Sequence, residues 1–474
     1  MFALRPLLPA TFALALGACD DSPRFTQAEP GEALSGGSAT VKKLDRNAFS
    51  LPSANLSSVR RLDFSVGNSF FRNPWVIAPS TTTARDGLGP LFNTNACQNC
   101  HIKDGRGHPP TPGAVNAVSM LVRLSIPDDP AFARLIERTG VLPEPVYGGQ
   151  LQDMAIPGVR PEGKVRVDYD ERLISFKDGT QVSLRKPTLN ITELGYGPLH
   201  PHTQFSARIA PPMIGLGLLE AIPEAVILAQ ADPHDRDGNG IAGRANQVWD
   251  DALQKTVMGR FGWKAGQPNL NQQNAHAFSG DMGLTTRLKP ADDCTPAQTD
   301  CLNAPNGGSP AGEPEVSDNI LRQVLFYSRN LGVPARRDVE NPLVLAGKNL
   351  FYQAGCQQCH SPVFTTRADA AEPELANQII RPYSDLLLHD MGEGLADQRS
   401  EFQASGRDWR TAPLWGIGLT EAVSGHSQFL HDGRARNLLE AVLWHGGEAQ
   451  AAQQHVLGFN ASQRDALLAF LNSL

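Results

Sequence analysis

The chain has 474 residues, of which 41% are hydrophobic, and its 42 basic and 49 acidic residues give a net charge of −7. This length predicts two or three domains with sizeable cores. Because the basic residues form no tract, the composition argues against a nucleic-acid-binding protein. No stretch beyond the N-terminal leader has the roughly 18 uninterrupted apolar residues of a membrane helix, so a soluble body is expected.

The first residues predict export from the cytoplasm. Arg5 precedes an apolar stretch, residues 7–16, that is too short to span a bilayer. The sequence Leu-Gly-Ala-Cys that ends at Cys19 resembles a bacterial lipobox, so residues 1–18 are expected to be a signal peptide and Cys19 to carry lipid. An ordinary secretory signal with an incidental cysteine is the alternative. Asp20 resembles the enterobacterial signal for the inner membrane, which predicts a periplasmic, lipid-anchored protein with residues 19–60 as a tether.

Two short motifs predict covalently bound haem. A Cys-x-x-Cys-His run occurs twice, as Cys97, Cys100 and His101 and as Cys356, Cys359 and His360. In c-type haem attachment the two thiols bind the porphyrin and the histidine ligates the iron. A thioredoxin-like redox pair, or a zinc site made from both cysteine pairs, would leave the histidine after each pair unexplained. The sequence therefore predicts two haem c groups, in agreement with the export signal.

The two motifs divide the chain into two predicted haem domains, residues 61–331 and 338–474. Between residues 165 and 184, alternating apolar runs around a Lys-Asp-Gly-Thr turn predict a β-hairpin. The Pro- and Gly-rich stretch that follows predicts long loops, with helices at about 217–229 and 316–331. We therefore expect a mainly α protein of two cytochrome c-like domains, the first enlarged by a small β insertion and irregular loops.

Two further sites lie outside the haem motifs. Residues 235–240 have the Asp-x-Asp-x-Asn-Gly order of a calcium loop, but position twelve is Asn246 instead of the usual glutamate. Calcium and a metal-free acidic turn both remain open. Cys294 and Cys301 are the cysteines left after lipid and haem are assigned. Because the periplasm is oxidising, they are expected to form a local disulfide.

The second axial position of each iron separates an enzyme from an electron carrier. An iron with two protein ligands only passes electrons, whereas an open iron can bind peroxide or oxygen. For the second haem, the sequence predicts a helix with Asn437 as its N-cap and Glu440 three residues later. The apolar face of this helix ends at His445, which could therefore meet an iron. A histidine bound to solvent or to the last carbonyls of the helix is the alternative.

The second half resembles bacterial di-haem cytochrome c peroxidases, and most closely a branch of di-haem oxidoreductases. The resemblance lies in Asp-Trp-Arg-Thr-Ala-Pro-Leu-Trp at 408–415, His-Asp-Gly-Arg at 431–434 and the following Leu-Leu-Glu-Ala, and it extends over most of residues 60–474. In those peroxidases a methionine fourteen residues after the histidine of His-Asp-Gly ligates the second haem. His445 takes that position here. The resemblance thus implies a bis-histidine haem, with His360 and His445 as ligands and a lower potential than in the peroxidases.

The resemblance also implies a carboxylate over the first haem. The Leu-Leu-Glu-Ala at 218–221 echoes the one in the second half, which makes Ala225 the expected counterpart of His445. Glu220 is then the candidate acid–base residue for O–O cleavage, and a purely structural N3 position is its alternative. Other residues could instead close the first iron, or carry electrons between the haems. They are Met213, His108, His200 and His202 for the iron, and Trp409 and Trp415 for the electrons.

These features predict a periplasmic di-haem oxidoreductase of peroxidase type. The first haem is expected to react with peroxide or another small oxidant, and the second to exchange electrons with a small redox protein or a quinol-linked partner. One alternative is an electron carrier with two saturated irons, and another is an enzyme that oxidises side chains of a protein partner. The long insertions argue against a carrier, which needs only about 100 residues for each haem domain.

Overall fold

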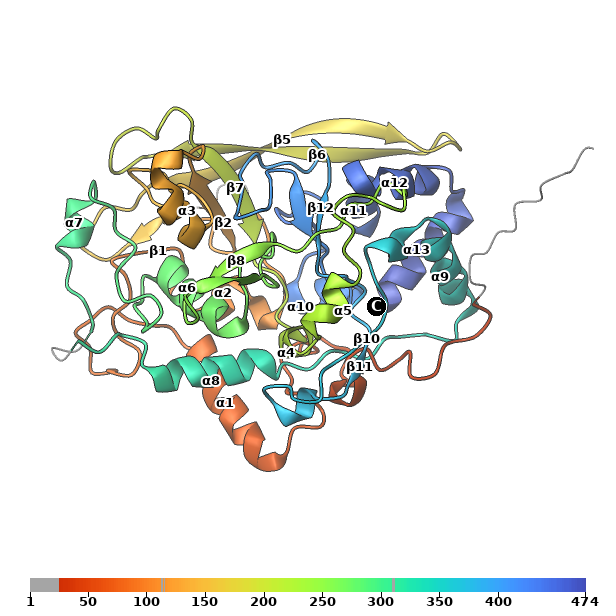
Figure 1. The fold of residues 1–474 in the computed structure, drawn as a ribbon, viewed down its shortest axis with the longest axis horizontal. Coiled ribbons are helices and arrows are strands. Elements are labelled where there is room, and N and C mark those ends of the chain that lie inside the picture. Colours follow the sequence, from red (N-terminus) through yellow and green to blue (C-terminus); the bar gives the residue numbers. More distant parts are fainter. Residues whose placement is uncertain (1–24, 112–113, 115, 309–311) are drawn as a thin grey trace, which may run out of the picture.

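The computed structural model describes residues 25–111, 114, 116–308 and 312–474 (Figure 1). The predicted signal peptide and Cys19 lie outside these residues. None of the described helices is long and apolar enough to cross a membrane.

The helices and strands are distributed along the whole described chain. The helices are α1 (Ser58–Arg72), α2 (Cys97–Cys100), α3 (Ala133–Thr139), α4 (Leu216–Glu220), α5 (Glu224–Leu228), α6 (Leu270–Met282), α7 (Thr299–Leu302), α8 (Asp318–Arg329), α9 (Pro342–Gln353), α10 (Thr420–Ser424), α11 (Leu438–Leu443), α12 (Gln450–Leu457) and α13 (Ala461–Ser473). The strands are β1 (Leu91–Phe92), β2 (Met120–Ser125), β3 (Gln150–Leu151), β4 (Met154–Ala155), β5 (Lys164–Ser175), β6 (Gln181–Thr192), β7 (Gln204–Ile209), β8 (Gln247–Asp250), β9 (Lys255–Met258), β10 (Phe364–Thr365), β11 (Ile379–Ile380), β12 (Leu388–Asp390) and β13 (Asp408–Arg410).

The prediction of a mainly α fold is wrong, because only 29% of the structure is helical and 17% is strand. The helix expected at 217–229 is divided into α4 and α5 by Pro223, which disfavours helical backbone in the residue before it. Strand comes from small antiparallel sheets, of which β3-β2-β7 has three strands. The hairpin β5–β6 pairs over its whole length, from Lys164 with Thr192 to Ser175 with Gln181.

Each half of the chain contains a pair of helices that cross at a glycine. In the first half α1 packs on α8, and a Cβ added at Gly67 would lie 2.2 Å from the carbonyl oxygen of Gln323. In the second half α9 packs on α13, and a Cβ added at Gly347 would lie 1.9 Å from the carbonyl oxygen of Ala466. Only glycine allows such close backbone approach. Each Cys-x-x-Cys-His motif follows the first helix of its pair in the chain.

The hairpin β5–β6 and the segment before α1 are two of the segments that connect the halves. The hairpin β5–β6 runs across the top of Figure 1 to the second half, where Arg464 lies 2.7 Å from Asp178 of the hairpin turn. The segment before α1 also reaches the second half, because the buried carboxylate of Glu32 is ion-paired with Arg336 and with Lys348. A shared apolar core contains side chains from both halves, so the two haem motifs lie in one packed body.

Candidate functional site

A cavity lies beside each Cys-x-x-Cys-His motif. Cavity 1 has a volume of about 350 Å³ and is lined by Cys97, Cys100 and His101, among other residues. Cavity 2 has a volume of about 340 Å³ and is lined by Cys356, Cys359, His360 and His445. None of these four cysteines forms a disulfide bond with another described cysteine. Both volumes fall in the range of small-molecule and cofactor sites.

Three histidines of these cavities are oriented as metal ligands. Nδ1 of His101, His360 and His445 lies 2.8 Å from the carbonyl oxygen of Pro211, Tyr383 and Ala441 respectively. Because a carbonyl only accepts, Nδ1 carries the hydrogen in each ring and Nε2 keeps its lone pair. Burial lowers the pKa of His101 and His360 to about 4, and it also lowers the pKa of His445. At neutral pH each ring is therefore uncharged and able to ligate a metal.

The spacing of two of these rings tests whether cavity 2 fits a haem iron. The ring centroids of His360 and His445 are 6.5 Å apart. Two metal–nitrogen bonds of about 2 Å each, together with half of each ring, place the centroids about 6 Å apart. His360 and His445 therefore fit one iron held between them, with the two adjacent cysteines placed for the porphyrin.

Helices α6 and α11 occupy corresponding positions beside the two cavities. Each begins after an asparagine N-cap, Asn269 or Asn437, whose side chain accepts a backbone hydrogen bond from the third following residue. The first, fourth, fifth and eighth residues after the cap line the cavity in both cases. They are Leu270, Gln273, Asn274 and Ala277 in cavity 1, and Leu438, Ala441, Val442 and His445 in cavity 2. The eighth position thus holds a ligand in cavity 2 and a methyl group in cavity 1.

None of the other residues predicted as ligands of the first iron lies on α6, the helix that corresponds to α11. Met213 lines cavity 1, but it follows two residues after Pro211, whose carbonyl holds His101, and so belongs to the His101 side. His108, His200 and His202 are not among the described residues that line either cavity. Ala225, the expected counterpart of His445, is an exposed residue of α5 and also lies outside the cavities. The helix that corresponds to α11 is therefore α6 rather than the predicted one.

Glu220 is not among the described residues that line cavity 1 either. Its Oε2 lies 2.6 Å from Nε of Arg329, and its Oε1 accepts a hydrogen bond of 2.9 Å from the backbone N–H of Leu270. Leu270 is the first residue of α6, so this carboxylate satisfies a free N–H at a helix N-terminus, where negative charge is favourable. Glu220 thereby holds the start of the helix that lines cavity 1.

Three arginines that line cavity 1 carry buried donors without partners. Nε of Arg106, Nη2 of Arg208 and Nε of Arg399 are buried and have no hydrogen-bond partner among the described residues. Burial lowers the pKa of Arg106 and Arg399 to about 10, so both stay charged at neutral pH. Guanidinium groups of this kind fit carboxylates such as the propionates of a haem. The donor set of cavity 1 therefore fits the group that its Cys-x-x-Cys-His motif implies.

Trp263 lies between the two cavities. It lines both of them, together with Arg106, Arg410, Ala412 and Pro413. Its Nε1 donates a hydrogen bond of 2.8 Å to the carbonyl of Ile209, which fixes the indole. Of the two tryptophans singled out from the sequence, Trp409 lines only cavity 2 and Trp415 only cavity 1. The aromatic side chain placed between the haem motifs is therefore one that the sequence did not indicate.

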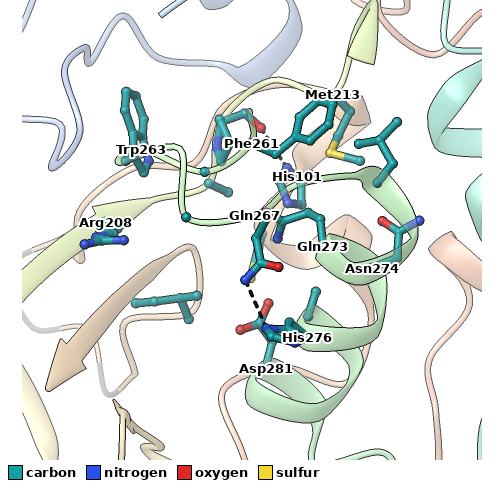
Figure 2. A pocket seen from close by; sticks show the side chains of 18 of the residues that line it. His101, Arg208, Met213, Phe261, Trp263, Gln267, Gln273, Asn274, His276 and Asp281 are labelled. Atoms are coloured by element: carbon teal, nitrogen blue, oxygen red, sulfur yellow. Dashed lines mark hydrogen bonds between the residues drawn. The ribbon is translucent and has the colours of Figure 1, made fainter. Parts of the chain in front are cut away.

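Cavity 1 also contains three hydrogen-bonded polar residues that the sequence did not indicate. Nε2 of His276 lies 2.7 Å from Oδ2 of Asp251. Nε2 of Gln267 lies 3.0 Å from Nδ1 of His276 (Figure 2). A signal for this site was present in the sequence, because the Asn-Leu start of α6 repeats the Asn-Leu start of α11.

Beside cavity 2, His389 lies between two carboxylates. Its Nε2 is 2.9 Å from Oδ2 of Asp385, and its Nδ1 is 2.7 Å from Oε2 of Glu448. Burial opposes the charge on this ring, but the bonds to Asp385, Cys359 and Glu448 raise the pKa of His389 well above its usual value of 6.5. A buried imidazolium therefore lies next to Cys359, one of the two cysteines predicted to hold the second haem.

Of the remaining predicted sites, the cysteine pair lies apart from the cavities, whereas Asn239 of the predicted calcium loop lines cavity 2. Cys294 and Cys301 form a disulfide bond. In the predicted calcium loop, Oδ1 of Asp235 accepts a hydrogen bond from the backbone N–H of Gly240. Asn246, at position twelve, donates hydrogen bonds to the backbone carbonyls of Lys264 and Glu401. Calcium at this loop stays a prediction.

Residues 31–474 match the family model described as "Di-haem oxidoreductase, putative peroxidase". The match covers nearly the whole chain, so the protein belongs to this family of di-haem oxidoreductases. Comparisons with curated proteins and with solved structures found no match. The family implies two haem groups, in agreement with the two Cys-x-x-Cys-His motifs and their cavities.

Proposed function

We propose that this protein is a periplasmic di-haem c oxidoreductase of peroxidase type with one reactive and one electron-transferring haem. The observation that carries the proposal is the difference between Ala277 and His445 at corresponding positions of α6 and α11. His445 can close the iron bound to His360, whereas Ala277 leaves the iron bound to His101 without a ligand from this helix. An electron carrier would need both irons closed.

The protein's own residues would hold and orient the two haems. The thiols of Cys97 and Cys100 would attach the first haem, and those of Cys356 and Cys359 the second. When bound, the haems supply the one-electron redox chemistry. Fixed by backbone carbonyls, His101, His360 and His445 present Nε2 toward the cavities, and Trp263 offers an aromatic side chain between them.

The N-terminal sequence supports a periplasmic location with a lipid anchor at Cys19 and association with the inner membrane. Peroxide, or another small oxidant, is the proposed substrate of the first haem. The complete reduction of hydrogen peroxide to water takes up two electrons and two protons. The electrons would come from a small redox protein or a quinol-linked donor through the second haem. This direction of electron flow is part of the proposal.

Low-temperature electron paramagnetic resonance (EPR) of the oxidised holoprotein tests the proposal. We expect one high-spin ferric signal from the first haem, which peroxide consumes, and one low-spin signal from the bis-histidine haem. The spectrum would be repeated after reduction by one electron. A high-spin signal that appears only then would contradict the open iron inferred from Ala277 in the oxidised state. Two low-spin signals that resist peroxide in both states would overturn the enzyme proposal and favour an electron carrier.

A further inference from the structure

One residue that lines cavity 1 carries a buried, unsatisfied hydrogen-bond acceptor. Among the described residues that line it, Oε1 of Gln267 is the buried side-chain oxygen that has no hydrogen-bond partner. The backbone of Gln267 is fixed, because it exchanges two hydrogen bonds with Phe261, of 2.9 and 3.2 Å, across a short loop. The side-chain amide of Gln267 can still turn either its oxygen or its NH₂ group toward the cavity.

His276 and Asp251 set this orientation. The carboxylate of Asp251 can only accept, so Nε2 of His276 carries a hydrogen and donates it over 2.7 Å. In an uncharged imidazole Nδ1 is then an acceptor, and it must receive its hydrogen from the NH₂ group of Gln267, 3.0 Å away. The oxygen of Gln267 consequently points away from His276.

The charge on His276 depends on its surroundings. Burial lowers the pKa of His276 below 6.5, the hydrogen bond to Asp251 raises it, and the charges of Lys289 and Arg123 lower it. These three charged residues also line cavity 1. With the pKa lowered overall, the ring is uncharged at neutral pH. When it takes up a proton at lower pH, Nδ1 becomes a donor, and the amide of Gln267 must turn its oxygen to His276 and its NH₂ group to the cavity.

We propose that Gln267 is the residue that hydrogen-bonds a small ligand at the first haem, and that Asp251 and His276 are positioning residues that select which end of its amide is offered. This inference rests on the proposed function, because it requires an open iron in cavity 1. With its oxygen in the cavity, Gln267 favours protic ligands such as water and hydrogen peroxide, which donate hydrogen bonds. With its NH₂ group in the cavity, it favours anions that only accept.

Fluoride is a suitable probe, because it accepts hydrogen bonds but does not donate them. Its affinity for the ferric holoprotein would be measured from the absorption spectrum between pH 5 and 8, in wild type and in Gln267→Leu. We expect the wild-type affinity, relative to Gln267→Leu at the same pH, to rise about tenfold as His276 is protonated below pH 6.5, since a hydrogen bond to a charged group has an effect of this order. Using the ratio removes the pH dependence that fluoride binding has in both proteins.

A second variant keeps the test independent of pH. His276→Leu frees the amide, so its fluoride affinity at pH 7.5 should exceed that of wild type, and the gain should vanish when Gln267→Leu is also present. Gln454→Leu, which changes an exposed glutamine of α12, is the control and should behave as wild type. Absorption and circular dichroism spectra of each variant would establish that it retains both haems and its fold.

The outcomes separate this inference from the proposed function. The role of Gln267 is overturned if His276→Leu changes the fluoride affinity by the same factor whether residue 267 is Gln or Leu. It is also overturned if Gln267→Leu binds fluoride as wild type does at every pH. In both cases the open iron stands. If fluoride leaves the absorption spectra of wild type and of every variant unchanged, the first iron is closed and both proposals are overturned.

Discussion

His360 and His445 face each other across cavity 2 with their ring centroids 6.5 Å apart, a spacing that one metal ion fills. Both rings direct Nδ1 to a backbone carbonyl and so keep Nε2 free. His101 has the same arrangement in cavity 1, but α6 supplies Ala277 where α11 supplies His445. The two sites thus share a plan, but the position that holds a second histidine in cavity 2 holds an alanine in cavity 1.

Replacement of Ala277 by histidine should close the first iron. The new imidazole would stand at the position of His445, so we expect the high-spin ferric EPR signal to be replaced by a low-spin one and the reaction with peroxide to fall by about 100-fold or more, a loss typical of removing an essential catalytic element. Ala225→His, at an exposed position of α5, is the matched control. An unchanged high-spin signal in Ala277→His would show that α6 does not face the iron.

Replacement of His445 by methionine should raise the reduction potential of the second haem. A thioether stabilises ferrous iron better than an imidazole does, so we expect a rise on the order of 0.1 V. Spectroelectrochemical titration of both haems would measure it, and the potential of the first haem serves as the internal control. If the potential of the first haem moved instead, the assignment of His445 to the second iron would be wrong.

Glu220→Gln distinguishes a structural role from acid–base chemistry. Because the carboxylate pairs with Arg329 and binds the first N–H of α6, its loss should lower the free energy of unfolding by about 1–3 kcal/mol. We expect turnover per haem and its pH profile to stay unchanged, since Glu220 is not among the residues that line cavity 1. Denaturant unfolding and steady-state kinetics at several pH values would measure both. A loss of turnover with unchanged stability would instead support the acid–base role predicted from the sequence.

The ion pairs of Glu401 predict an acid-sensitive contribution to stability. Burial acts to raise the pKa of Glu401, but Arg208, Arg399 and Arg123 lower it from 4.5 to about 2. A carboxyl group whose pKa is depressed by folding stabilises the protein above pH 4.5, and this stabilisation is lost as the pH falls toward 2. Glu401→Gln should therefore cost on the order of 3 kcal/mol at pH 6, and much less at pH 3.

Denaturant unfolding at both pH values would test this, with the exposed Glu224→Gln as the control. An equal loss for Glu401→Gln at pH 6 and pH 3 would show that the charge of Glu401 is not what stabilises this cluster.

The sequence predicted those features that depend on short-range pattern. The two haem motifs, the helix α8 and the hairpin β5–β6 follow from local spacing, apolar periodicity and turn residues. The position of His445 near the end of a helix follows from the N-cap at the start of that helix. The prediction of α4 as the counterpart of α11 is wrong because it rests on the sequence Leu-Leu-Glu-Ala at 218–221, which α11 also contains. The true counterpart, α6, shares instead the Asn-Leu start of α11, at Asn269 and Leu270. Pro223 also breaks the helix expected at α4.

The polar residues of cavity 1 could not be predicted because only the fold brings them together. Asp251, Gln267 and His276 lie on different loops and a helix, and single polar residues of this kind have no local pattern. Trp263 was overlooked for the same reason, since only the packing of the two halves places it between the cavities. The helical content was overestimated because many turns of helix in the long loops end after four or five residues.

The attachment of the N-terminal segment would orient the protein at a membrane if Cys19 carries the proposed lipid. Phe25 exchanges two hydrogen bonds, of 2.7 and 2.9 Å, with the side chain of Asn349 on α9, in the half that carries the second haem motif. Cys19, the proposed lipid-bearing residue, is only six residues earlier, a reach of at most about 20 Å. A lipid at Cys19 would hold this surface of α9 within that distance of the bilayer. The bis-histidine half would then be the one presented to electron donors in or on the membrane.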